Sequence, residues 1–259
     1  MRNLILLLAL LLPAQALAQE WAKSRLKKSP RHLEWVELKH GDRTLKAFVA
    51  YPERAEKAKV IVVIHEIFGL TDWARLMTDE LAAAGYIAIA PDLLSGSGPN
   101  GGGTASLGGV DEARKAIREL PPDQITADLK AAVDYGLKLP AANGQVSVAG
   151  FCWGGTESFR FATNEKRLKA AYVFYGTGPD QVASIACPVY GFYAENDARV
   201  GATIEATRAL MKKAGKTYQP VTYKGAGHGF MRAGEDPEGS AENKQARDQA
   251  WKRWMDLLK

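Results

Sequence analysis

A cysteine stands between glycines in the segment GFCWGG at residues 150–155. An apolar, strand-like run precedes it and a helix is expected after it, so Cys152 occupies the nucleophile position of a sharp strand-to-helix elbow. Gly150 and Gly154 suit so tight a turn, because a side chain at either position would crowd the neighbouring backbone. The positive end of the following helix dipole favours a negatively charged sulfur. These residue types indicate a thiol nucleophile for acyl transfer.

An acid and a histidine follow the cysteine in chain order, each after its own apolar run. Asp197 comes after the run 189–193, and His228 follows the run 221–223 inside the segment GAGHGF. Nucleophile, acid, histidine is one of the known chain orders for a catalytic triad. We predict that Asp197 orients His228, that His228 moves the thiol proton, and that Cys152 carries the acyl group.

These residues need a scaffold that brings the ends of separate strands together. Residues 33–39 and 44–51 alternate apolar and polar side chains around a short turn, which predicts an antiparallel hairpin. Beyond them, apolar runs alternate with helical patterns, which predicts βαβ units in a sheet covered on both faces. Strands are expected at 59–64, 86–90, 146–149, 170–174, 189–193 and 221–223, with helices over 73–84, 125–137 and at the C-terminus. We therefore predict an α/β protein with a mostly parallel, doubly wound sheet, whose chemistry gathers at the carboxyl ends of the strands.

The first eighteen residues have the pattern of a secretory signal peptide. Arg2 is followed by an apolar run of nine residues, 4–12, and by the small-x-small sequence ALA at 16–18. Spanning a bilayer takes roughly 20 apolar residues, so stable membrane insertion is not expected. We expect cleavage after Ala18, one domain over residues 19–259, and a periplasmic or secreted protein. A buried amphipathic N-terminal helix is the alternative.

Composition limits the classes of protein that this chain can belong to. Of its 259 residues, 46% are hydrophobic and 24% are charged, which fits a globular enzyme and excludes disordered and membrane-embedded classes. The net charge is only +5, and most basic residues are interleaved with acids, so nucleic acid is not an expected partner. Cys152 and Cys187 fall at opposite ends of the predicted parallel sheet, too far apart for a disulfide.

Two sequence features could indicate a cofactor or a metal, but neither has the sequence context that such a site requires. Residues 96–101 read G-x-G-x-x-G, but they contain Pro99 and do not lie between the first strand of a βαβ unit and its helix. The four histidines, at 32, 40, 65 and 228, have neither H-x-x-x-H spacing nor cysteine partners. We expect neither a cofactor nor a metal.

Taken together, the motifs resemble those of the dienelactone hydrolases, or carboxymethylenebutenolidases, a family with the α/β-hydrolase fold. The resemblance covers nearly all of the chain after residue 18. It rests on Asp197 and on four segments: HEIFG at 65–69, APDL at 90–93, GFCWGG at 150–155 and GHGFMR at 227–232.

The resemblance implies roles for residues beside the nucleophile. It implies the same triad of Cys152, Asp197 and His228, with the backbone N–H groups of Ile67 and Trp153 forming an oxyanion hole. It places Glu66 beside the thiol, where the carboxylate restrains the sulfur until substrate binds.

By the same resemblance, Arg232 matches the arginine that holds a substrate carboxylate, and Tyr175 matches a pocket tyrosine. A solvated surface arginine is the alternative for Arg232. The family usually has a second arginine soon after the Pro-Asp-Leu segment, where this chain has SGSG at 95–98. The glycine-rich stretch 95–109 is either a mobile lid or a surface loop without function. We therefore expect broad use of activated esters or lactones rather than a preference for a dicarboxylate-like dienelactone.

The predicted function is hydrolysis of a small-molecule ester or lactone through a thioester on Cys152, by a monomer. A general short-chain carboxylesterase and a cysteine peptidase would use the same triad. A non-catalytic exported binding protein is the remaining alternative. Turnover of a peptide amide would favour the cysteine peptidase. A reactive thiol without esterase turnover would favour the binding protein.

Overall fold

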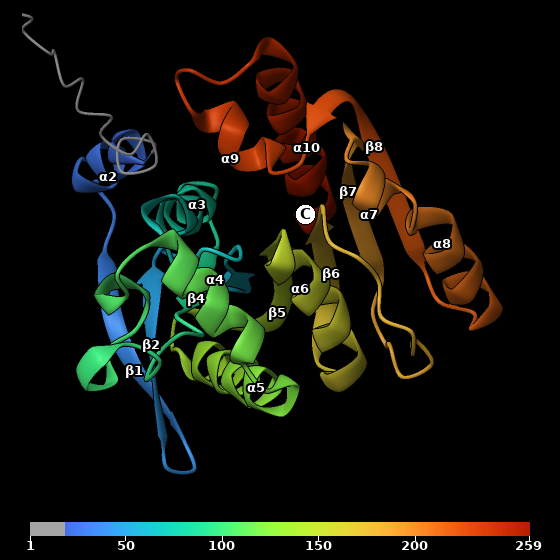
Figure 1. The fold of residues 1–259 in the computed structure, drawn as a ribbon. Coiled ribbons are helices and arrows are strands. Elements are labelled where there is room, and N and C mark those ends of the chain that lie inside the picture. Colours follow the sequence, from blue (N-terminus) through green and yellow to red (C-terminus); the bar gives the residue numbers. More distant parts are fainter. Residues whose placement is uncertain (1–18) are drawn as a thin grey trace, which may run out of the picture.

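The computed structural model describes residues 19–259, so the expected signal peptide at 1–18 lies outside the described residues. One eight-stranded sheet crosses the molecule in the order β1-β2-β4-β3-β5-β6-β7-β8 (Figure 1). The strands are β1 (Leu33–His40), β2 (Arg43–Ala50), β3 (Ala58–Ile64), β4 (Ile87–Pro91), β5 (Ala142–Phe151), β6 (Leu168–Phe174), β7 (Val189–Asn196) and β8 (Tyr218–Gly227).

Helices occupy most of the connections between the strands. They are α2 (Glu20–Lys27), α3 (Asp72–Ala83), α4 (Val110–Glu119), α5 (Pro122–Lys138), α6 (Trp153–Asn164), α7 (Ala198–Gly201), α8 (Ile204–Lys213), α9 (Phe230–Glu235) and α10 (Ala241–Leu258). Two short 3-10 turns, η1 (Pro99–Gly101) and η2 (Thr104–Ser106), lie in the glycine-rich stretch.

The pairing of the strands confirms the predicted sheet. β1 and β2 form an antiparallel hairpin, and β2 also pairs antiparallel with β4. The neighbouring strands from β4 through to β8 are all parallel, so their carboxyl ends meet at one edge of the sheet. This is the mostly parallel α/β arrangement expected from the alternation of apolar runs and helical patterns.

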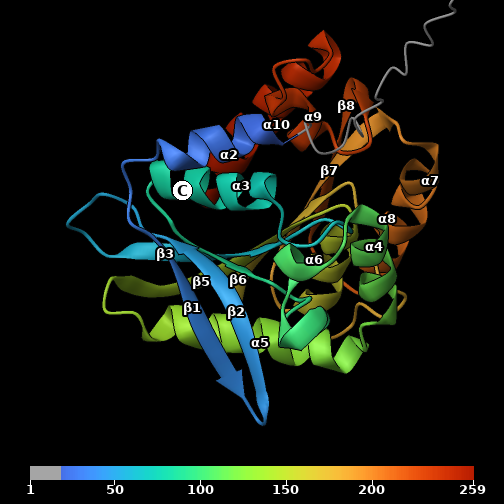
Figure 2. The same cartoon turned by 60° about the vertical axis from the view of Figure 1, so that its left-hand side comes forward.

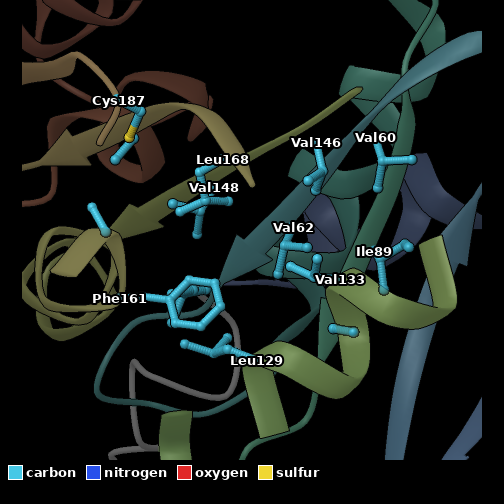
Figure 3. Packing of buried hydrophobic residues seen from close by; sticks show 14 of the residues in the cluster. Val60, Val62, Ile89, Leu129, Val133, Val146, Val148, Phe161, Leu168 and Cys187 are labelled. Carbon is cyan, nitrogen blue, oxygen red and sulfur yellow. The ribbon is translucent and has the colours of Figure 1, made fainter. Parts of the chain in front are cut away.

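Helices pack on both faces of the sheet, with α2, α3 and α10 on one side and α5 and α6 on the other (Figure 2). The continuous apolar run of β3 serves both cores. Val60, Val62 and Ile64 join the core under α5. Figure 3 shows Val60 and Val62 there, close to Leu129 and Val133 of the helix. Ile61 and Val63 belong to the core on the other face, with residues of α3 and α10. A strand segment buried on both faces has to be apolar at every position, as residues 60–64 are, whereas Lys59 near the start of β3 is only partly buried.

The two cysteines are free, and the sheet separates them along its strands. Cys152 follows the carboxyl end of β5, whereas Cys187 is buried just before the start of β7. Burial raises the pKa of the Cys187 thiol to about 11, so this sulfur stays protonated and unreactive at neutral pH. Among residues 19–259, no helix combines the length and apolar character needed to cross a bilayer.

Candidate active site

The three residues predicted to form a triad lie at the carboxyl ends of three parallel strands. Cys152 follows β5 and caps the N-terminus of α6. Asp197 follows β7 and caps α7, while His228 follows β8 and stands two residues before α9. The sheet therefore brings together side chains that are 31 to 76 residues apart in the sequence.

The backbone at Cys152 is strained and tightly packed. Its φ of 58° and ψ of −118° lie in a region that residues other than glycine rarely adopt. A Cβ at Gly150 would lie 1.8 Å from the carbonyl oxygen of Gly154, and a Cβ at Gly154 would lie 2.3 Å from that of His65. Only glycine fits at either position, so α6 can begin directly against the end of β3 and hold the sulfur at the turn.

Asp197 and His228 form the closest polar contact of the site. Nδ1–H of the imidazole donates to Oδ2 of Asp197 at 2.5 Å, and the amide of Val200 donates to the other carboxylate oxygen at 3.3 Å. The carboxylate is buried, and the imidazole is about one-third exposed. With Nδ1 engaged by Asp197, Nε2 is the ring atom left for the thiol, which is the orientation needed of a general base.

The surroundings of His228 favour a protonated ring. Burial by itself lowers the pKa of His228, but hydrogen bonds to Cys152 and Asp197, together with their negative charges, raise it to about 9. A protonated imidazole beside the sulfur stabilises negative charge there and is poised to donate to a leaving group.

The loop that presents His228 is held by three polar side chains outside the predicted site, those of Glu195, Asn196 and Asn243. The amide of Gly225 donates to Glu195 at 2.8 Å, and the side-chain amide of Asn196 donates to the carbonyl of Gly225 at 3.0 Å. The amide of Gly227 donates to Asn243 of α10 at 2.9 Å. Glu195 and Asn196 immediately precede Asp197 and could have been noticed for that reason, whereas nothing near Asn243 in the sequence indicated its role.

The two backbone amides predicted to form an oxyanion hole belong to Ile67 and Trp153. Ile67 lies in a tight turn closed by a hydrogen bond of 3.1 Å from the amide of Gly69 to the carbonyl of Glu66, and the Ile67 amide donates to no group within residues 19–259. Trp153 is the first residue of α6, so its N–H has no acceptor within that helix. The close approach of Gly154 to the carbonyl of His65 brings the Ile67 turn and the start of α6 together.

Glu66 pairs with Arg232 in the structure. Nε of Arg232 donates to Oε2 of Glu66 at 2.7 Å, and the Glu66 side chain is almost fully buried. The charge of Glu66 raises the pKa of Arg232, against the lowering effect of burial. Within the described chain, no hydrogen bond joins Glu66 to Cys152, and Oε2 of the carboxylate accepts from Arg232. The predicted effect of Glu66 on the thiol stays a prediction.

A second arginine approaches the site from α4. The guanidinium of Arg114 lies 5.1 Å from the centre of the Phe68 ring, and that of Arg232 lies 5.4 Å from the same ring. Arg114 also forms an ion pair with the exposed Asp111 at 3.4 Å. Arg114 could not be predicted from the sequence as a neighbour of Phe68, because the folding of the glycine-rich stretch decides where α4 lies.

Tyr175 is buried beneath the imidazole. Its ring meets His228 edge-on at 5.1 Å and Phe230 at 5.3 Å, and its backbone has a φ of 42°. Burial raises the pKa of Tyr175 well above its ordinary value, so the phenol is neutral. Its hydroxyl has no hydrogen-bond partner among the side chains and backbone of residues 19–259. The Tyr175 ring therefore packs directly against His228, while its buried hydroxyl has no partner in the described chain.

The wall next to Ile67 and Trp153 is apolar. Both side chains are partly exposed and pack against a small apolar cluster, half of which comes from α4. The cluster contains Leu94, Leu107, Ala113, Ala116, Ile117 and Leu120. No group of three or more His, Cys, Asp and Glu in the described part of the chain is arranged to hold a metal ion. The site therefore combines a thiol, an imidazole paired with a carboxylate, two free amides and an apolar wall.

Comparison with known proteins identifies relatives over most of the chain. Residues 45–259 match the model of the dienelactone hydrolase family. A Methylorubrum extorquens protein named "Putative carboxymethylenebutenolidase" is 29% identical over 239 residues, which cover 86% of this chain and 79% of that protein. A Salmonella typhi protein of the same name is 30% identical over 201 residues, covering 71% of this chain and 72% of its own.

Solved structures share the fold. The crystal structure titled "Putative Dienelactone Hydrolase" from Klebsiella pneumoniae superimposes with a TM-score of 0.76 at 24% identity, covering 88% of this chain and 98% of its own. An acylaminoacyl peptidase from Pyrococcus horikoshii gives a TM-score of 0.64 at 18% identity, over 90% of this chain and 42% of the peptidase. The match of the family model over residues 45–259 and the shared fold together establish that this chain belongs to the dienelactone hydrolase family.

Proposed function

We propose that this protein hydrolyses carboxylic esters or lactones of small molecules through a thioester on Cys152. The observation that carries the proposal is the arrangement of Cys152, His228 and Asp197, in which a carboxylate orients an imidazole toward a sulfur held at a strained elbow. The family membership supports the same reaction class.

In the proposed acylation step, the sulfur of Cys152 attacks the substrate carbonyl and an S–C bond forms. The electron pair of the C=O bond moves to the oxygen, where the amides of Ile67 and Trp153 stabilise the negative charge. When the C=O bond re-forms, the C–O bond to the leaving group breaks. His228 gives its proton to the leaving oxygen, and a thioester remains on Cys152.

In the proposed deacylation step, neutral His228 takes a proton from water. The resulting hydroxide attacks the thioester, the same two amides stabilise the second oxyanion, and the C–S bond breaks. The acid leaves, and the imidazole retains the proton beside the regenerated sulfur. For a lactone, the leaving oxygen and the acid belong to one ring-opened molecule.

We propose neutral activated esters and lactones as the preferred substrates. Glu66 already balances the charge of Arg232, and Asp111 lies beside Arg114. The apolar wall next to Ile67 and Trp153 suits an uncharged acyl chain. A dienelactone carrying a carboxylate would have to compete with Glu66 for Arg232. A higher kcat/KM for such a dienelactone than for neutral short-chain esters would contradict this preference.

The test measures turnover by the protein that comprises residues 19–259. The substrates are p-nitrophenyl acetate, p-nitrophenyl butyrate, a dienelactone and a peptide amide. Cys152→Ala and His228→Ala are expected to abolish ester turnover, and acid quenching of the wild type is expected to trap an acyl group on Cys152 by mass spectrometry. Ester turnover that survives in Cys152→Ala would overturn the proposal. Preferred turnover of the amide would indicate a peptidase on the same triad.

We also propose that the protein is exported and cleaved after Ala18. The support is the sequence of residues 1–18 alone, with its basic start, apolar run and ALA site. Expression of the full chain in a bacterium with an outer membrane should yield a periplasmic or secreted product that begins at Gln19, as determined by mass spectrometry. A product that keeps residues 1–18 would contradict it.

A further inference from the structure

The turn that carries Ile67 is fixed at its first residue by a histidine. The carbonyl of Glu66 accepts from Nδ1 of His65 at 2.8 Å, so the hydrogen of that ring must be on Nδ1. Nε2 is then free to accept from the amide of Leu93 at 3.3 Å. His65 is fully buried, and burial lowers its pKa despite the nearby charge of Asp92, so the ring stays neutral and keeps both bonds.

The other end of the same turn is fixed by a threonine from the glycine-rich stretch 95–109. The amide of Leu70 donates to Oγ1 of Thr104 at 2.9 Å. The hydroxyl hydrogen of Thr104 goes to Oδ1 of Asp92 at 2.7 Å, which leaves a lone pair of Oγ1 to accept from Leu70. The amide of Thr104 donates to the other oxygen of Asp92 at 2.8 Å, so one buried carboxylate orients both the backbone and the side chain of Thr104.

Two glycines make these contacts possible. A Cβ at Gly69, whose φ is +77°, would lie 2.3 Å from Oγ1 of Thr104. A Cβ at Gly103 would lie 2.2 Å from Oδ2 of Asp92. A side chain at Gly69 would displace Thr104 from the Ile67 turn, and one at Gly103 would displace Asp92. This part of the glycine-rich stretch is therefore closely packed against the turn and does not lie loosely on the surface.

We propose that Thr104, oriented by Asp92, is a positioning residue that holds the Ile67 amide at the distance and angle needed for the oxyanion. The pair Asp92–Thr104 is called the clamp below. This inference rests on the proposed function, in which the Ile67 amide stabilises negative charge on the substrate oxygen. It assigns the glycine-rich stretch a role different from both a mobile lid and a functionless loop.

The clamp acts mainly on the transition state. An oxyanion-hole donor has to lie about 2.7–3.1 Å from the oxygen that becomes charged, and losing one donor costs about 10² to 10³ in rate. Without the Thr104 hydroxyl, the amide of Leu70 loses its acceptor, and the turn that starts at Glu66 is held at one end only. Substrate binding needs no such accuracy, so kcat should fall while KM changes little.

Three variants separate the hydroxyl from the shape of the side chain. Thr104→Val keeps the branched shape and removes the hydroxyl, whereas Thr104→Ser keeps the hydroxyl. Ser106→Ala is the matched control, because the Ser106 hydroxyl donates to the carbonyl of Gly103 at 2.8 Å within the same stretch. We expect kcat for p-nitrophenyl butyrate to fall about 10- to 100-fold in Thr104→Val, while KM of that variant stays within about threefold of wild type. In Thr104→Ser and Ser106→Ala, kcat should also stay within about threefold of wild type.

Two further readouts distinguish a lost oxyanion contact from a general structural effect. A short alkyl trifluoromethyl ketone accepts the sulfur at its carbonyl carbon, and its oxygen becomes an oxyanion. Its inhibition constant should weaken in Thr104→Val by a factor similar to that for kcat. Alkylation of Cys152 by iodoacetamide forms no oxyanion, so its rate should stay at the wild-type value.

Wild-type kcat in Thr104→Val would overturn the clamp. So would a fall in kcat that is matched by an equal fall in the alkylation rate, because that pattern means general damage to the site. The proposed function is tested separately by Cys152→Ala. If Cys152→Ala is inactive while Thr104→Val is fully active, only the clamp fails, whereas an active Cys152→Ala removes the basis of both.

Discussion

The carboxylate of Glu66 lies 2.7 Å from Nε of Arg232, so an ion pair joins the turn that carries Ile67 to helix α9, which follows His228. Most of the contact is shielded from solvent, since the side chains are 3% and 30% exposed. Two parts of the site that lie on different loops are therefore linked by one charged contact.

Glu66→Gln should destabilise the protein, because it leaves the guanidinium of Arg232 without a matching charge. We expect the free energy of unfolding in urea to fall by about 1–3 kcal/mol. The double variant Glu66→Gln/Arg232→Gln should recover part of that loss, since it removes both charges. Fully additive effects of the two single changes would show that the pair contributes no coupling energy.

The raised pKa of His228 predicts the alkaline limb of the pH profile. The ring holds its proton below about pH 9 in the free enzyme, and that proton is the one donated to the leaving group. We therefore expect kcat/KM to fall as the pH rises through about 9, whereas a rate that keeps rising to pH 10 would contradict this assignment.

The same shift predicts the sign of a stability effect. Because the folded pKa lies above the unfolded value of about 6.5, the contribution of His228 is complete below about pH 6.5 and is lost as the pH rises through about 9. In Cys152→Ala, the hydrogen bond and charge at position 152 disappear while burial remains. The pKa of His228, followed by NMR, should therefore be lower in that variant than in the wild type.

A buried carboxyl group at the end of α9 predicts a second pH effect. Burial and the charge of Glu80 raise the pKa of Glu235 to about 8, against the opposing charges of Arg247 and Arg25. The folded pKa again exceeds the unfolded one, so this contribution is complete below about pH 4.5 and is lost as the pH rises through about 8.

Glu235→Gln resembles the protonated acid and cannot ionise. We expect the variant to be more stable than the wild type at pH 9, with the difference shrinking or reversing below pH 5, as measured by urea unfolding across this range. A difference that does not depend on pH would show that Glu235 keeps its ordinary ionisation in the folded protein.

The packing of the elbow predicts which glycines can change. Gly154→Ala would place a Cβ 2.3 Å from the carbonyl oxygen of His65 and 2.4 Å from that of Ile64. We expect a loss of about 3 kcal/mol or more in the free energy of unfolding, or failure to fold. Gly201→Ala is the control, because nothing lies within 4 Å of the added atom. It should leave stability unchanged or raise it by up to about 1 kcal/mol.

The sequence carried enough local signal to predict the sheet and the positions of the triad residues. Burial determines which residues are apolar in the hairpin and in β3, so both elements appear in the sequence as a regular pattern of apolar residues. Cys152, Asp197 and His228 each follow such a run, so their meeting at one edge followed from the parallel order of the strands. The glycines around Cys152 similarly reveal a close backbone contact.

Contacts between distant loops produce no such periodic pattern in the sequence. That Thr104 would reach Leu70 and that Arg114 would lie over Phe68 depends on the path of the glycine-rich stretch and on the angle of α4. That Glu66 would contact Arg232 depends on how the loop after β3 meets α9. These contacts join residues 34 to 166 positions apart, and each involves a residue type that is common on surfaces. Periodicity and spacing cannot predict which of many such pairs will form.

At the elbow, backbone rests on backbone: Gly150 abuts the carbonyl of Gly154, and Gly154 abuts those of Ile64 and His65. The location of the sulfur is therefore set largely by contacts between main-chain atoms. Under the proposed function, we expect substitutions at Leu107 or Ala116 to change the preference among acyl chains and to leave the alkylation rate of Cys152 unchanged. Reactivity and selectivity would then be set by different parts of the molecule, and the substrate range would change one apolar residue at a time.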